Sequence, residues 1–128
     1  MGISLLSAGG GRACAKLNIS PAVMQPTGLY HAGAIVSLAD TTATSACLAE
    51  TNPNGEPRAD LFPLAIQISS NLVRNTNEGG LTADAEIIHR GRTTMVVNVR
   101  VADERGRLVA NTVVTLLAPA GISAESEG

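Results

Sequence analysis

Alternating apolar and polar residues predict one strand near the start of the chain. Residues 12–20 have one apolar face and one face of charged or polar side chains, which is typical of a half-buried strand. The apolar positions are Ala13, Ala15, Leu17 and Ile19. Residues 1–11 end in three consecutive glycines, so we expect them to form a loose lead-in rather than part of the fold.

The hydrophobic pattern changes to the period of a helix between residues 32 and 50. This stretch has no proline and one glycine near its start, and small apolar residues recur three or four positions apart. These residues are Ala39, Ala43, Ala46 and Ala49. Their short side chains allow a sheet to wrap closely around the helix. Three threonines are mediocre helix formers, so packing rather than propensity must hold the helix.

Four more alternating segments follow the helix and predict four strands. They span residues 64–72, 81–90, 95–101 and 108–118. Short glycine-containing turns join these four consecutive strands, which demands antiparallel neighbours. One strand, one long helix and four consecutive strands predict a single α+β domain, in which the helix packs against a curled antiparallel sheet of about five strands. Residues 119–128 are small and polar and are expected to form a loose tail.

Composition narrows the classes of partner. The chain has 128 residues and a net charge of −2, which argues against nucleic acid as the main partner. Tyr30 and Phe62 are the only aromatic residues. Apolar runs fall short of the roughly 20 residues that span a bilayer, so no membrane is expected. Cys14 and Cys47 are expected to be inert thiols of a cytoplasmic protein, and the spacing of Cys and His favours no metal site.

Candidate chemistry lies between residues 25 and 40. A polar turn and a glycine-containing helix start precede Asp40, an acid inside the predicted helix. Backbone N–H groups at a helix N-terminus are unpaired and carry partial positive charge, so they can hold a carbonyl oxygen that becomes an oxyanion. Ser37 and Thr44 lie about one turn before and after Asp40, on the same face of the helix.

This series resembles the PaaI-like (phenylacetate-type and 4-hydroxybenzoyl-CoA thioesterase) branch of the hotdog-fold acyl-CoA thioesterases. The residues that carry the signature are, in order, Gln25, Gly28, His31, Ala32, Gly33, Leu38 and Asp40. The similarity continues through residues 71–74, 89–93 and 103–110 and covers about residues 11–118. It implies the hotdog fold, whose order of one strand, a helix and four strands matches the order predicted from the hydrophobic pattern.

The resemblance implies hydrolysis of an aryl- or acyl-coenzyme A thioester. Asp40 would act as nucleophile or as general base for water, and the N–H of Ala32, next to Gly33, would polarise the carbonyl. Gln25 would orient the water or the carboxylate, and the hydroxyl of Thr44 would assist. No cofactor is implied, because coenzyme A is part of the substrate.

The resemblance also implies that the helix start and the acid of one site come from different subunits. We therefore expect a homodimer at least, and a homotetramer as the full assembly. Arg74, Arg90 and Arg92 are candidates for binding the coenzyme A phosphates. Arg92 is the strongest of the three because it lies between Gly91 and Thr93 in a segment that matches the family.

Two positions depart from the family pattern, and several simpler interpretations stay open. Ala32 stands where the family usually has glycine, and Ala65 where some members have serine. His31 fits a structural role at the helix start better than a catalytic one, and Thr44 can also bond back to a helix carbonyl. Any one of the arginines can be a solvated charge at a strand end.

Two other functions compete with hydrolysis. One is non-catalytic binding of acyl-coenzyme A by the same fold. The other is a hydratase or dehydratase, which ranks lower because such enzymes resemble a pattern with Pro-Gly before the helix that this chain lacks. The sequence does not identify the acyl group or the pathway.

Overall fold

The computed structural model describes residues 2–119, which contain six strands and one long helix. The strands are β1 (Ile3–Gly9), β2 (Arg12–Leu17), β3 (Leu64–Leu72), β4 (Leu81–Arg90), β5 (Thr94–Ala102) and β6 (Leu108–Leu117), and the helix is α1 (Ala32–Thr51). Short 3-10 turns cover Pro21–Val23 and Ala59–Leu61. The predicted α+β arrangement is confirmed, and the predicted tail lies outside the described residues except for Pro119.

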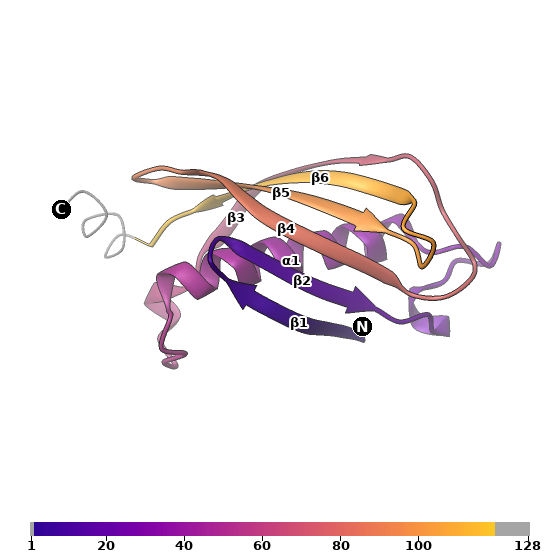
Figure 1. The fold of residues 1–128 in the computed structure, drawn as a ribbon, viewed down its shortest axis with the longest axis horizontal. Coiled ribbons are helices and arrows are strands. Elements are labelled where there is room, and N and C mark those ends of the chain that lie inside the picture. The colour runs from indigo at the N-terminus through magenta and orange to yellow at the C-terminus, as the bar shows by residue number, and fades with distance from the viewer. Residues whose placement is uncertain (1, 120–128) are drawn as a thin grey trace.

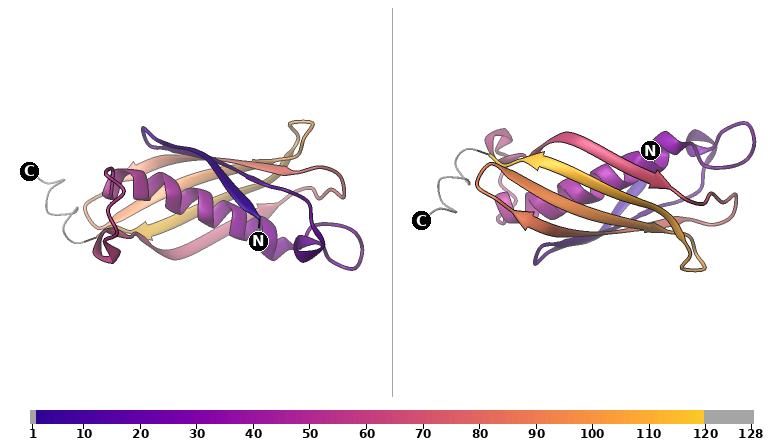
Figure 2. Two further views of the ribbon diagram at one scale, coloured as in Figure 1. Left: turned by 90° about the horizontal axis from the view of Figure 1, so that it is seen from below. Right: turned by 90° about the horizontal axis from the view of Figure 1, so that it is seen from above.

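All strands join one antiparallel sheet in the order β1-β2-β4-β5-β6-β3. The sheet curls over α1, and Figure 2 shows the helix lying along one face of it (Figures 1 and 2). On the outer face, the exposed or half-buried side chains are mostly polar, in agreement with the predicted alternation; examples are Arg12, Asp84, Glu86, Arg100 and Asn111. β1 and β3 are the two edges of the sheet. β3 pairs with β6 and not with β4, so the prediction that a short turn makes β3 and β4 neighbours was wrong; residues 73–80 instead connect the β3 edge to β4 across the width of two strands.

The core lies between α1 and the inner face of the sheet. Alanines at positions 39, 43 and 46 are fully buried and have short side chains, so the sheet approaches the helix backbone closely. Ile35 and Leu38 fill the space toward the helix start, and each contributes about 1.5–3 kcal/mol by burial. Sheet residues that complete the core include Leu17, Leu81, Val97, Val99, Val101, Val109, Val114 and Leu116.

The prediction of a loose N-terminal lead-in was wrong. Residues 3–9 form β1, which pairs with β2 through a hairpin. Gly10 and Gly11 have φ values of 62° and 78°, a left-handed conformation that favours glycine, so the glycines form a tight turn rather than a flexible segment. A register shift at Leu6 interrupts the alternation of β1, which removes the sequence pattern of a strand.

The helix α1 has the length and the apolar composition of a membrane-crossing helix, although the sequence was expected to contain no such stretch. Nine of its residues are buried in the structure. Most of them face the sheet, which is the place of a core helix in a globular domain.

The edge strand β3 is the most exposed apolar element of the described chain. Leu64, Ile66, Ile68 and Leu72 are between 41% and 61% exposed, although β6 pairs with the whole strand on its other side. Ile68 and Leu72 pair with the buried Val114 and Ala110, so they lie on the helix side of the sheet, where α1 does not cover them. This nine-residue edge strand has unpaired backbone groups along one side, as edge strands that pair with another chain do.

Candidate functional site

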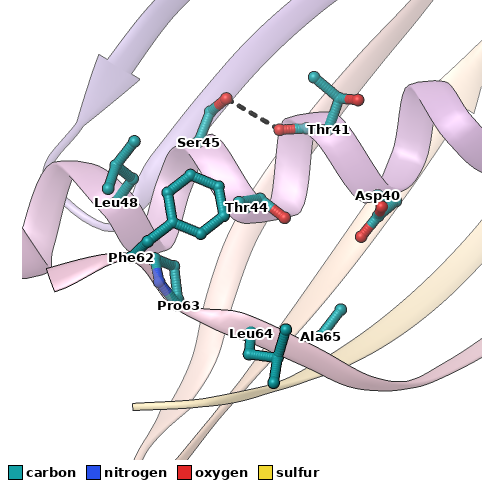
Figure 3. Close-up of a pocket in the computed structure, with 9 residues that line it drawn as sticks. All are labelled: Asp40, Thr41, Thr44, Ser45, Leu48, Phe62, Pro63, Leu64 and Ala65. Atoms are coloured by element: carbon teal, nitrogen blue, oxygen red, sulfur yellow. Dashed lines mark hydrogen bonds between the residues drawn. The ribbon is translucent and has the colours of Figure 1, made fainter. Parts of the chain in front are cut away.

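A groove of about 400 Å³ runs between the exposed side of α1 and the beginning of β3 (Figure 3). The helix side carries polar groups, and the opposite side is apolar. Its lining residues are Asp40, Thr41, Thr44, Ser45 and Leu48 from the helix, and Phe62, Pro63, Leu64 and Ala65 from the segment that enters β3. Ala65, the position where some family members have serine, therefore lies at the groove.

Asp40 has a buried carboxylate oxygen that lacks a partner. Its Oδ1 atom is inaccessible to solvent and accepts no hydrogen bond from any described residue. Figure 3 shows the carboxylate directed toward the groove. A buried polar atom without a partner costs about 1–3 kcal/mol, so a water, a ligand or another chain that donates to Oδ1 would stabilise this position.

The hydroxyl groups beside Asp40 differ in how they are bound. Thr42 donates to the carbonyl of Leu38 at 2.6 Å, and Ser45 donates to the carbonyl of Thr41 at 2.8 Å. No bond of this kind holds Thr44 within the described residues. The hydroxyl of Thr44, one turn after Asp40, is therefore available to a molecule in the groove.

The helix start lies apart from Asp40 within one chain. Ala32 and Gly33 are exposed, and a side chain at Gly33 would meet open space. His31 is the N-cap residue of α1, and its side chain makes no capping hydrogen bond. Eight residues separate Ala32 from Asp40, which is about 12 Å along the helix axis. One chain therefore does not bring the predicted N–H donor and the predicted acid to one carbonyl group.

Gln25 belongs to the helix start rather than to the groove. Its backbone N–H donates to the carbonyl of Leu29 at 2.8 Å, which closes the predicted turn. Its side-chain Nε2 donates to the carbonyl of Tyr30 at 3.4 Å. The predicted site residues thus form two groups in one chain: Asp40 and Thr44 line the groove, whereas Gln25 and its neighbours hold the start of α1.

Two residues that hold the helix start were not recognised in the sequence as site residues. Asn75 bonds to both the N–H and the carbonyl of Tyr30, at 3.1 and 2.9 Å. The hydroxyl of the fully buried Tyr30 donates to the carbonyl of Gly79 at 2.7 Å. Burial, and then the nearby charge of Glu104, raise the pKa of Tyr30. Forty-five positions separate Tyr30 from Asn75, so no local pattern indicates this contact.

The three candidate arginines are divided between the two ends of the sheet. Arg90 pairs with Glu50 at 2.7 Å near the end of α1. Arg92 and Thr93 follow in the β4–β5 turn, where a side chain at Gly91 would come within 2.7 Å of the His89 ring and within 3.1 Å of the carbonyl of Thr94.

Arg74 lies at the other end of β3 and is exposed. Ten residues of extended chain separate it from Leu64, which is about 30 Å. One chain therefore does not bring Arg74 together with Arg90 and Arg92.

The two cysteines have the environment of inert thiols, as predicted. Burial raises the pKa of Cys47 to about 12, against a smaller opposing effect of Arg90. Burial also raises the pKa of Cys14, together with a hydrogen bond to Asp84. Within residues 2–119, no group of three His, Cys, Asp or Glu side chains is placed to hold a metal ion.

Comparison with known proteins gives a consistent result. The family model of the thioesterase superfamily matches residues 27–110. The 1,4-dihydroxy-2-naphthoyl-CoA hydrolase of Listeria monocytogenes is 30% identical over 85% of this chain and 84% of its own length.

Solved structures agree on the fold. A thioesterase from Haemophilus influenzae superposes with a TM-score of 0.77 and 28% identity, covering 91% of this chain and 77% of that one. A hypothetical thioesterase from Streptococcus pneumoniae, solved with coenzyme A, superposes with a TM-score of 0.79 over 91% of this chain and 87% of that one. At 20% identity, the second likeness concerns the fold alone.

Proposed function

The chain belongs to the thioesterase superfamily, has the hotdog fold and is a thioester hydrolase, and on this premise we propose that it hydrolyses a coenzyme A thioester at a site shared by two copies of the chain. The observation that carries the proposal is the buried, unpartnered carboxylate oxygen of Asp40 at the edge of the groove. The name of the Listeria relative, a hydrolase of an aryl-coenzyme A ester, supports the choice of coenzyme A thioesters.

Asp40 has two ways to start the reaction. As nucleophile, its carboxylate attacks the thioester carbonyl, the C–S bond breaks, the thiolate of coenzyme A leaves, and water then hydrolyses the mixed anhydride. As general base, it takes a proton from water while the hydroxide attacks the same carbon. Both routes consume one water and release the free acid and coenzyme A. The free hydroxyl of Thr44 lies on the same helix face and is suited to hold the water.

The 12 Å separation of Ala32 and Asp40 requires a second copy if both groups act on one carbonyl. Antiparallel pairing of two β3 edges about a two-fold axis continues the sheet and places the two helices side by side in opposite directions. The start of one helix then lies at the end of the other copy's β3 where the groove is found. Its exposed N–H groups and dipole would stabilise the oxyanion there, with Gln25 beside them.

The same pairing covers the apolar side chains of β3, which supports a homodimer as the smallest complete unit. The homotetramer expected from the sequence requires a second interface in addition to β3.

The apolar side of the groove is suited to hold the acyl group. From Asp40, the groove follows α1 for about 12 Å to Leu48, where Phe62 and Leu64 form the opposite wall. For the phosphates of coenzyme A, Arg92 is the preferred cation of its end of the sheet, because it lies between Gly91 and Thr93 in the turn that matches the family.

The test is hydrolysis of a panel of aryl- and acyl-coenzyme A esters, followed by thioester absorbance, with Asp40→Asn beside the wild type. Loss of the nucleophile or general base should lower kcat by about 10²–10⁴-fold. Asp84→Asn, an exposed aspartate on the outer face of the sheet, is the matched control and should keep full activity. Full activity of Asp40→Asn would refute the assignment. Binding of the esters without turnover by the wild type would instead indicate a non-catalytic acyl-coenzyme A binder.

A further inference from the structure

The peptide that leads into α1 is held by the side chain of a residue beyond the end of β3. Asn75 uses both halves of its amide on Tyr30: Oδ1 accepts the backbone N–H at 3.1 Å, and Nδ2 donates to the carbonyl at 2.9 Å. Oδ1 also accepts the N–H of Thr76 at 2.7 Å, which fixes the orientation of the amide. Two bonds from one rigid amide to one residue hold that residue as a neighbouring strand would.

This contact determines where the first N–H groups of α1 point. The peptide between Tyr30 and His31 is fixed at its carbonyl by Asn75 and at its N–H by the carbonyl of Val23, at 2.9 Å. The next N–H along the chain belongs to Ala32, the proposed oxyanion donor. Only the backbone rotations of His31 separate that N–H from the clamped peptide, so a shift of Tyr30 moves the donor directly.

We propose that Asn75 is a positioning residue for catalysis, and that it acts on the site of the opposite subunit. The inference rests on the proposed function, in which the helix start of one copy serves the Asp40 of the other. The residues between β3 and Asn75 are themselves anchored, because the N–H groups of Val73 and Arg74 both donate to the carbonyl of Val109, at 2.9 and 3.2 Å. In each chain, residues 73–75 thus connect β3, the strand proposed to pair with the second copy, to the start of α1, which is proposed to serve the site of that second copy.

Asn75→Ala should lower kcat by about 10- to 100-fold and leave KM nearly unchanged, because it displaces a group that acts on the oxyanion rather than on bound substrate. Asn98→Ala is the matched control. Its amide is paired with that of Asn111 at 3.1 and 3.4 Å on the outer face of the sheet, so its loss should leave kcat unchanged. Wild-type kcat in Asn75→Ala would overturn the inference.

Asn75→Asp provides a second variant in case the alanine variant does not fold. The carboxylate keeps the contacts to the N–H groups of Tyr30 and Thr76 but has no donor for the carbonyl of Tyr30. It should lose kcat at least as strongly as the alanine variant, whereas wild-type kcat would show that the carbonyl contact has no part in positioning.

Mixed dimers test whether the effect crosses between subunits. A dimer of one Asn75→Ala chain and one Asp40→Asn chain has one site with an intact acid and an intact helix start, and one site that lacks both. Random association of equal amounts makes half of the dimers mixed, so activity should reach about a quarter of the wild type, whereas Asn75→Ala alone keeps about a tenth or less and Asp40→Asn about a hundredth or less.

No recovery on mixing would overturn action across the interface, provided that mass spectrometry of intact complexes detects the mixed dimer. The two proposals fail differently. Activity of the Asp40→Asn homodimer would overturn the proposed function and this inference with it. An inactive Asp40→Asn beside a fully active Asn75→Ala would overturn this inference alone.

Discussion

Replacing Ile68 by lysine tests whether two copies associate along β3. Ile68 lies in the middle of the strand, on the helix side of the sheet, and is 41% exposed in a single chain. Because its side chain already reaches solvent, a lysine at this position can extend into water while the chain stays monomeric. The variant should therefore fold normally and fail to dimerise.

The expected weakening follows from the exposed fraction. Complete burial of an isoleucine contributes about 1.5–3 kcal/mol, so covering the exposed 41% contributes about 0.6–1.2 kcal/mol per copy. Two-fold symmetry places this contribution in the interface twice, so the loss is about 1–2.5 kcal/mol and the dissociation constant should rise by about 5- to 60-fold. Two ammonium groups brought together near the axis weaken the dimer further.

Sedimentation velocity and specific activity over a range of protein concentrations measure both consequences. The variant should become monomeric at concentrations where the wild type is dimeric, and its specific activity should rise with concentration as dimers reform. Ile88→Lys is the control, since Ile88 is 58% exposed in β4 and far from β3 in the sheet. A dimer of unchanged affinity would refute association along β3, and a fully active monomer would refute the shared site.

Two further predictions concern the groove and the stability of the fold. Phe62→Ala should lower kcat/KM for benzoyl-coenzyme A about two- to tenfold relative to acetyl-coenzyme A, since an aromatic pair contributes about 0.5–1.5 kcal/mol beyond its buried area; an equal decrease for both esters would contradict contact with the acyl group. Asp103→Asn should lower the urea midpoint at neutral pH. Burial alone would raise the pKa of Asp103, but hydrogen bonds from the backbone N–H and guanidinium of Arg107 and from the N–H of Arg105 outweigh it and lower the pKa. A carboxyl whose pKa is lower in the folded state stabilises the fold above the unfolded pKa of about 3.9, and this contribution disappears as the pH falls through the folded value. The difference between wild type and variant should therefore close in acid, and a difference that persists there would contradict the charge-based explanation.

The helix and most strands were predictable because their patterns are long and clearly bounded. The helix was predicted over residues 32–50 and ends at Thr51, and β3 has the predicted bounds. β1 was missed because its alternation is broken at Leu6 and its glycines resemble those of a flexible segment. A tight turn and a flexible segment have the same composition, and only the pairing with β2 distinguishes them.

The site was predictable only where local spacing determines geometry. Asp40 and Thr44 share a helix face because they are four residues apart, and both line the groove. The apolar wall at Phe62 and the clamp of Asn75 on Tyr30 depend on contacts between segments far apart in the chain, which a single sequence does not encode locally. In the sequence, Asn75 is recognisable only as a residue type that is common in turns.

Pairing of two copies along β3 would relieve two unfavourable features of the single chain. The unpaired oxygen of Asp40 and the uncovered side chains of β3 each destabilise an isolated copy, and the groove lies between Asp40 and Leu64, the first residue of that strand. Pairing along β3 would bury the apolar side chains and, in the same step, bring the helix start of the second copy to within reach of a carbonyl held at Asp40. On this reasoning, a chain selected for stability as a monomer would have a polar β3 and a paired Asp40. The presence of both features therefore argues that assembly and catalysis depend on the same surface.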